Sequence, residues 1–139
     1  MSKRILVVED QEDNRRILRD LLGSAGYELT EAENGEEALA ALAKQQPDLI
    51  LMDIQLPIMD GYEATRRIRT NPDLKSVPII AVTSHALAGD EEKALTAGCN
   101  GYVSKPYSPR DLLAKVRAYL AQSHEFHHEV AADRALKAW

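Results

Sequence analysis

The sequence predicts an α/β protein built on a parallel sheet, and three observations support this. Short apolar runs alternate along the chain with segments that carry apolar residues at helical spacing. Two of the runs, ILVV at residues 5–8 and LILM at residues 49–52, are apolar throughout, which is typical of strands buried on both faces. The chain has 139 residues, 45% hydrophobic and 28% charged, which suits one globular domain.

Five strands are predicted from apolar or alternating runs bounded by turn residues. The first and third are the apolar runs above, and the second, YELTEA, alternates as a half-exposed strand does. The fourth, VPIIAV, has its proline near the start, where a missing N–H is tolerated, and the fifth, GYVS, is short. In chain order the predicted strands cover residues 5–8, 27–32, 49–53, 77–82 and 101–104.

A helix is predicted after each strand. The first carries leucine and isoleucine at helical spacing and stops before a glycine, and the second is opened by Asn-Gly and closed by a proline. The third ends before Asn-Pro, the fourth stops at a glycine, and the fifth has a proline at its first turn. These helices cover about residues 12–25, 35–46, 61–69 and 87–97, and a last segment that starts at Pro109 and carries Leu112, Leu113, Val116, Tyr119 and Leu120.

Polar residues follow four of the five strands. Glu9-Asp10 ends the first strand, Asp53 the third, Thr83-Ser84 the fourth and Ser104-Lys105-Pro106 the fifth. In an open α/β sheet, ligands bind outside the carboxyl ends of the strands, at the point where the strand order reverses. Nothing comparable follows the second strand, as expected if it lies at the sheet edge. We therefore predict a flavodoxin-like (βα)5 doubly wound, parallel five-stranded sheet of order 2-1-3-4-5.

The chemistry of these strand ends suits a phosphoryl group. Three carboxylates, from Glu9, Asp10 and Asp53, would repel one another unless one is protonated or a cation joins them. A few oxygen ligands suit Mg²⁺, which is often bound together with a phosphate oxygen. Lys105 adds a positive charge and Thr83 a hydroxyl donor, and phosphoryl transfer depends mainly on positioning and charge. An aspartate can be the nucleophile, and Asp53 in mid-sheet is the best candidate.

Four segments at the strand ends carry a resemblance to a known family. VVEDQEDNR, DLILMDIQLPIMDG, AVTSHA and GYVSKP follow one another in this order. With them the chain resembles a response regulator receiver domain of bacterial two-component signalling, over about residues 3–121. The sequences of these segments are especially similar to those of single-domain receivers of the bacterial cell-cycle type and of receivers in hybrid histidine kinases. We expect a receiver domain over residues 1–121 and a helical or disordered tail over 122–139.

The resemblance implies a role for each of these residues. Asp53 would take a phosphoryl group from a histidine kinase or histidine phosphotransfer protein. Asp10, Asp53 and the Gln55 backbone carbonyl would ligate Mg²⁺, with Glu9 acting through a water. Thr83 and Lys105 would contact the phosphoryl oxygens, and Tyr102 would move inward together with Thr83 as a switch. Gln55 and His85 would control the phosphate lifetime. The Lys105-Pro106 peptide bond is often cis in this family.

Composition limits the partners. The net charge of −5 and pI near 5.4 argue against a nucleic-acid binder, and no apolar run approaches the roughly 18 residues of a membrane span. The single cysteine, Cys99, and the absence of a signal-peptide segment fit a cytoplasmic protein. With no second domain within the 139 residues, we expect the signal to pass to a downstream protein or through phosphate relay. We expect the protein to be a monomer or weak dimer. We also expect it to catalyse no reaction beyond its own phosphorylation and dephosphorylation.

Two of these features have other interpretations. Asp10 could simply precede a helix capped by Asp13 or Asn14, and Thr83-Ser84 could cap the fourth helix. HEFHH at residues 124–128 matches a zinc-hydrolase motif, but a third ligand and a cleft are not evident there.

Three other functional classes fit less well. An aspartate-nucleophile phosphatase typically carries a second aspartate where Gln55 stands. A flavin carrier would have a phosphate loop rich in Ser, Thr and Gly where Glu9 to Asp13 stand. A degenerate receiver used as a scaffold would lack some of the acidic, hydroxyl and lysine positions, and here all are filled.

Overall fold

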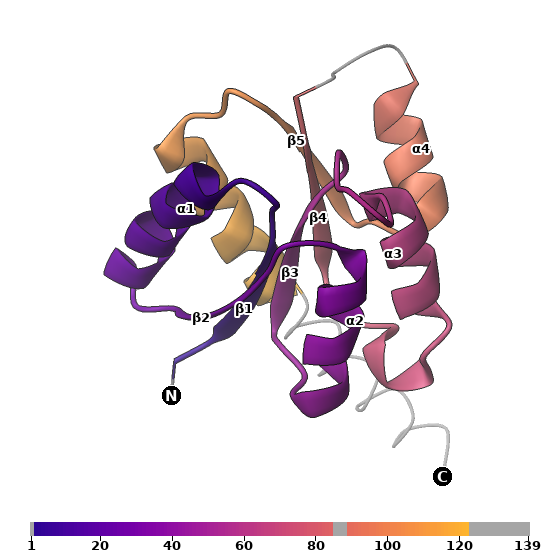
Figure 1. Ribbon diagram of the computed structural model, residues 1–139. Helices are drawn as coiled ribbons and strands as arrows, with labels where there is room; N and C mark the ends of the chain where they lie inside the picture. Colours follow the sequence, from indigo (N-terminus) through magenta and orange to yellow (C-terminus); the bar gives the residue numbers. More distant parts are fainter. Residues whose placement is uncertain (1, 85–88, 123–139) are drawn as a thin grey trace, which may run out of the picture.

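The computed structural model describes residues 2–84 and 89–122, and these contain one five-stranded sheet (Figure 1). The strand order is 2-1-3-4-5 and all neighbouring pairs are parallel, which confirms the predicted topology. The strands are β1 (Arg4–Val8), β2 (Glu28–Ala32), β3 (Leu49–Asp53), β4 (Ile79–Thr83) and β5 (Gly101–Ser104).

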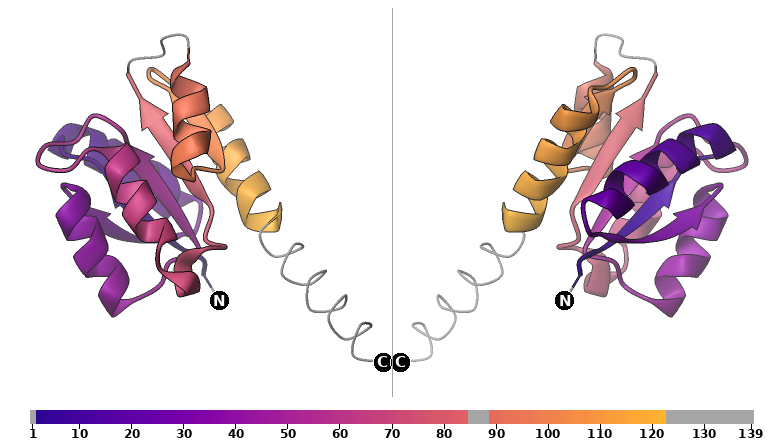
Figure 2. Two further views of the ribbon diagram at one scale, coloured as in Figure 1. Left: turned by 90° about the vertical axis from the view of Figure 1, so that its right-hand side faces the viewer. Right: turned by 90° about the vertical axis from the view of Figure 1, so that its left-hand side faces the viewer.

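Helices cover both faces of this sheet. Figures 1 and 2 show α1 and the helix over residues 109–122 on one face, with α2, α3 and α4 on the other. This is the doubly wound arrangement that right-handed crossovers produce. The named helices are α1 (Glu12–Ser24), α2 (Gly35–Lys44), α3 (Gly61–Arg69) and α4 (Asp90–Ala97), with a short 3-10 turn, η1 (Pro72–Leu74), between α3 and β4.

The three central strands carry the core because their side chains alternate between the two faces. All five residues of β3 are buried. Leu49 and Leu51 pack into the cluster under α1 and helix 109–122, whereas Ile50 and Met52 pack into the cluster under α2, α3 and α4. A strand this deeply enclosed gives the residue at its end, Asp53, a fixed position in the middle of the sheet.

Helices α2 and α3 each begin at a side-chain cap. Asn34 Oδ1 accepts from the Glu37 amide at the start of α2, and Asp60 Oδ1 accepts from the Glu63 amide at the start of α3, both at 2.9 Å. Each cap satisfies an amide that has no partner within its helix. The alternative in which Asp13 or Asn14 caps α1 is wrong, because both residues lie inside that helix, which follows Gln11.

Several element ends differ by one or two residues from the predictions. Strand β4 starts at Ile79 rather than at residue 77, because the Val77 amide donates to the Leu74 carbonyl and closes the turn after η1. The described part of α4 starts at Asp90, after Gly89 in a left-handed conformation, and the predicted start at Leu87 lies outside the described residues.

The loop after β3 folds back onto the strand end at a glycine. The Gly61 amide donates to the Ile54 carbonyl at 3.0 Å, which sets the start of α3 against the end of β3. A Cβ at this position would meet the Asp53 carbonyl oxygen and lie 2.8 Å from the Ile54 Cα. Both contacts are with backbone, so relief requires moving the chain beside Asp53.

We predict that Gly61→Ala destabilises the protein by about 2 kcal/mol or more, because the clash can be relieved only by displacing the backbone. Chemical denaturation of the variant measures this. Gly23→Ala is the matched control, since Gly23 lies in α1 with nothing within 4 Å of the added Cβ. That control should gain roughly 0.5–1 kcal/mol from helix propensity. Equal stability of the two variants would contradict the close approach.

Candidate functional site

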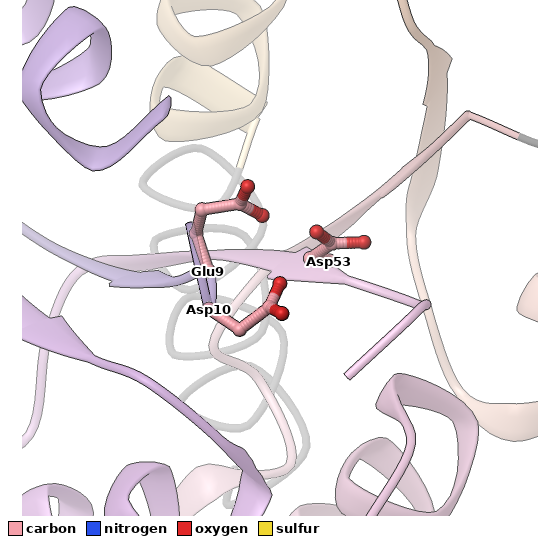
Figure 3. A group of neighbouring side chains, drawn as sticks. All are labelled: Glu9, Asp10 and Asp53. Carbon is pink, nitrogen blue, oxygen red and sulfur yellow. The ribbon is translucent and has the colours of Figure 1, made fainter. Parts of the chain in front are cut away.

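Three carboxylates from two neighbouring strand ends meet at the carboxyl edge of the sheet (Figure 3). Glu9 and Asp10 follow β1, and Asp53 is the last residue of β3. One oxygen from each lies within 4.8 Å of the others. Glu9 and Asp53 are 2% and 5% exposed, while Asp10 is half-buried. The parallel pairing of β1 with β3 therefore produces the predicted acidic cluster.

Lys105 supplies a cation to this cluster from the loop after β5. Its Nζ lies 3.2 Å from Asp53 Oδ2 and 3.3 Å from both carboxylate oxygens of Glu9. Its amide donates to the Thr83 carbonyl at 2.7 Å, which ties the loop to the end of β4. The structure thus brings together the lysine and two of the acids named from the sequence.

Charge crowding shows in the proton affinities. Burial, and then the neighbouring Asp53 carboxylate, raise the pKa of Glu9 from 4.5 to about 7, against the opposing effects of Asn14 and Lys105. Burial opposes the charge on Lys105, but Asp53 and Glu9 outweigh it and raise the pKa of the amine. One lysine therefore does not fully compensate the acids around it.

Gln55 bridges the ends of β3 and β4. Its backbone N–H donates to Asp53 Oδ1 at 3.0 Å, and its side-chain Nε2 donates to Thr83 Oγ1 at 2.6 Å. Its Oε1 accepts from the Ser84 amide at 3.2 Å. Thr83 is 1% exposed, so its hydroxyl is held between these strands at the edge of the site.

Two residues of α1 that were not predicted to belong to the site contact Glu9. Asn14 Nδ2 donates to Glu9 Oε1 at 2.6 Å, and Arg15 Nη1 donates to the Glu9 backbone carbonyl at 2.7 Å. A signal for Arg15 exists in the sequence: it shares the buried helical stripe of Leu18 and Leu22. An arginine on a buried stripe needs oxygen partners, and the acidic segment one turn earlier supplies one.

The remaining predicted site residues fall in different places. Tyr102 lies half-buried on β5, opposite Ala81 of β4, and packs against the core cluster under α2, α3 and α4. The Lys105-Pro106 peptide bond is cis, as the resemblance implies. His85 lies outside the described residues, as do His124 and His128 of the tail motif.

The donor set fits Mg²⁺. Its members are carboxylate oxygens, which hard divalent cations prefer, and they converge from two strands with one oxygen of each residue within 4.8 Å of the others. Burial, and then the Asp53 carboxylate, raise the pKa of Glu9, and a nearby divalent cation would favour its charged form. Asp10 and Asp53 would hold the ion, with Glu9 beside them.

Comparison with known proteins agrees with this geometry. The family model described as the response regulator receiver domain matches residues 5–117. The chain belongs to this family. The polar-differentiation response regulators DivK of Brucella anthropi and Brucella ovis are each 42% identical over 123 residues, covering 88% of this chain and all of theirs.

Solved structures of receivers have the same fold. A response regulator from Chloroflexus aurantiacus has a TM-score of 0.84 and 35% identity, covering 87% of this chain and 99% of its own. The receiver domain of the sensor histidine kinase PA1611 from Pseudomonas aeruginosa has a TM-score of 0.81 and 40% identity, with the same coverage. That structure has magnesium coordinated in its active-site cleft.

Family membership decides the functional class. Receiver domains bind Mg²⁺ in an acidic pocket and act in phosphorylation-dependent signalling with histidine kinases and downstream targets, and they are not classical enzymes. Over the described ranges 2–84 and 89–122, no helix has the length and apolar character needed to cross a membrane.

We predict that the metal-free protein loses stability as the pH rises from about 4.5 to 7. In this range the folded chain keeps a proton on Glu9 and the unfolded chain does not. The free energy of unfolding should therefore fall with rising pH, by on the order of 1–3 kcal/mol in total. Glu9→Gln should flatten this part of the curve in denaturation measured at several pH values. Glu63→Gln is the control, because Arg67 and Arg66 lower the pKa of that exposed carboxyl. An unchanged slope in Glu9→Gln would contradict the crowding.

Proposed function

We propose that this protein accepts a phosphoryl group on Asp53 from a histidine kinase or histidine phosphotransfer protein, with Mg²⁺, and then presents a changed surface to a downstream protein. The observation that carries the proposal is the convergence of Glu9, Asp10 and Asp53 around a shared point, with the Lys105 amine 3.2 Å from Asp53. These are the parts that phosphoryl transfer to an aspartate requires.

Each residue has a role in this mechanism. Asp10, Asp53 and the Gln55 backbone carbonyl would hold Mg²⁺, with Glu9 acting through a water. The bound ion would neutralise charge on the phosphoryl oxygens. An Asp53 oxygen attacks phosphorus as the bond from phosphorus to the donor histidine nitrogen breaks. Lys105, which already contacts Asp53, stabilises the charge of the transferred group.

Thr83 and Tyr102 are proposed to carry the change to the surface. Thr83 is buried at the end of β4 and would contact the phosphoryl group, and Tyr102 lies on the neighbouring strand β5. An inward movement of Tyr102 would alter the face formed by α4, β5 and helix 109–122. Gln55, which contacts both Asp53 and Thr83, and His85 are proposed to set the phosphate lifetime.

The organisation of the chain is part of the same proposal. Residues 1–121 would form the receiver and residues 122–139 an appended tail. The protein would work in the cytoplasm as a monomer or weak dimer, and would catalyse no reaction beyond its own phosphorylation and dephosphorylation.

We predict that incubation with Mg²⁺ and acetyl phosphate adds one base-labile phosphate, read out by intact mass. Asp53→Asn should remain unmodified because it removes the nucleophile. Asp60→Asn is the matched control: Asp60 caps α3 through its Oδ1, which the amide oxygen of asparagine replaces, so phosphorylation should persist. Modification that survives Asp53→Asn would refute the assignment.

A further inference from the structure

Besides its ion pair with Lys105, Glu9 makes three further contacts, and one of these three is with the sheet. Its amide donates to the Ala32 carbonyl at the end of β2, at 3.0 Å. Its carboxylate accepts from Asn14, and its carbonyl accepts from Arg15. Asn14 and Arg15 are consecutive residues of α1, so the start of this helix forms hydrogen bonds with both the side chain and the main chain of Glu9.

Arg15 is anchored for this contact. The residue is 6% exposed, and besides the Glu9 carbonyl its guanidinium contacts three carboxylates, one in α1 and two in or just after β2. Nη2 lies 2.6 Å from Glu12 Oε2 and 3.2 Å from Glu33 Oε1, and Nε lies 3.5 Å from Glu31 Oε1. The planar fork of a guanidinium can make these contacts at once, whereas a lysine ammonium on its shorter reach cannot.

Asp10 has little support of its own. In the part of the chain that the structure describes, its carboxylate accepts one hydrogen bond, from the neighbouring Gln11 side chain at 3.2 Å, and that pair is exposed. The direction of the Asp10 side chain is therefore set mainly by the backbone that leads into it. The Glu9 carbonyl is part of the peptide group that joins Glu9 to Asp10, and Arg15 fixes that carbonyl.

We propose that Arg15 is a positioning residue for the cation site: by holding the Glu9 carbonyl it aims the Asp10 carboxylate at Asp53. The inference rests on the proposed function in that it takes the acidic cluster to be the Mg²⁺ site. Arg15 touches neither the ion nor the phosphoryl group, and acts through the main chain at Glu9 and Asp10.

Simple electrostatics predicts the opposite effect, which makes the proposal testable. Removing a cation from beside an acidic site leaves Glu12, Glu31 and Glu33 less compensated, so the potential at the site becomes more negative. On charge alone, Mg²⁺ would bind Arg15→Met more tightly. If Arg15 positions Asp10, Mg²⁺ binds more weakly, and outer-shell partners of metal sites typically contribute about tenfold or more to affinity.

The experiment is a titration of the full chain with MgCl₂ at fixed ionic strength, followed by the amide signals of Asp10 and Gln55 in NMR spectra. We expect the Kd of Arg15→Met to rise about tenfold. Arg19→Met is the matched control, because Arg19 pairs with Glu31 and Glu12 of the same acidic group, and no contact joins it to Glu9 within the described chain. Its Kd should stay the same or fall.

Two further variants separate the possible failures. Arg15→Lys keeps the charge but loses the fork, so its Kd should also rise; a wild-type Kd there, or an unchanged or lower Kd in Arg15→Met, overturns the positioning role. Thermal unfolding in EDTA shows which variants are folded, and Arg15→Lys provides the test if Arg15→Met is not. Asp10→Asn should lose Mg²⁺ binding; wild-type binding in that variant would instead refute the cation site and the proposed function with it.

Discussion

The repulsion among Glu9, Asp10 and Asp53 is the constraint on which the functional part of this molecule depends. Two of these carboxylates are almost fully buried, and the three approach one another within 4.8 Å. Buried like charges are unfavourable, and a chain free to relax would separate them. The parallel pairing of β1 with β3 prevents this, since the two strands are fixed by apolar packing on both faces.

The surroundings of the cluster reduce that repulsion without abolishing it. Lys105 contacts both buried acids, Asn14 donates to Glu9, and the Gln55 amide donates to Asp53. The pKa of Glu9 is nevertheless raised, first by burial and then by the Asp53 carboxylate, against the opposing effects of Asn14 and Lys105. The site is therefore prepared for positive charge, and a divalent ion or a change of charge on Asp53 would alter the balance that holds the neighbouring loops.

Much of this could be predicted from the sequence, for physical reasons. The apolar runs of β1 and β3 are typical of strands buried on both faces, and a parallel sheet brings all its carboxyl ends to one edge. Asp53 and Lys105 were thus predictable as neighbours although 52 positions apart. The start of β4 was missed, because the turn hydrogen bond of the Val77 amide depends on local geometry.

The contacts of Asn14 and Arg15 with Glu9 were also missed. They depend on how α1 rotates over the sheet, which spacing alone does not determine. Gln55 was assigned a backbone ligand role and a role in phosphate lifetime, and the hydrogen bond of its side chain to Thr83 across two strands appears only in the structure. Sequence patterns thus identify which residues reach the site, while the tertiary fold determines which residues form hydrogen bonds that fix their positions.

The most direct test of the crowded-acid account is a crystal structure of the protein soaked in Mn²⁺, with the ion located by its anomalous scattering. The account predicts a strong peak at the carboxyl edge of the sheet, within bonding distance of Asp10 and Asp53, and near Glu9. A peak elsewhere, or no peak at saturating Mn²⁺ with the acids still assembled, would contradict it.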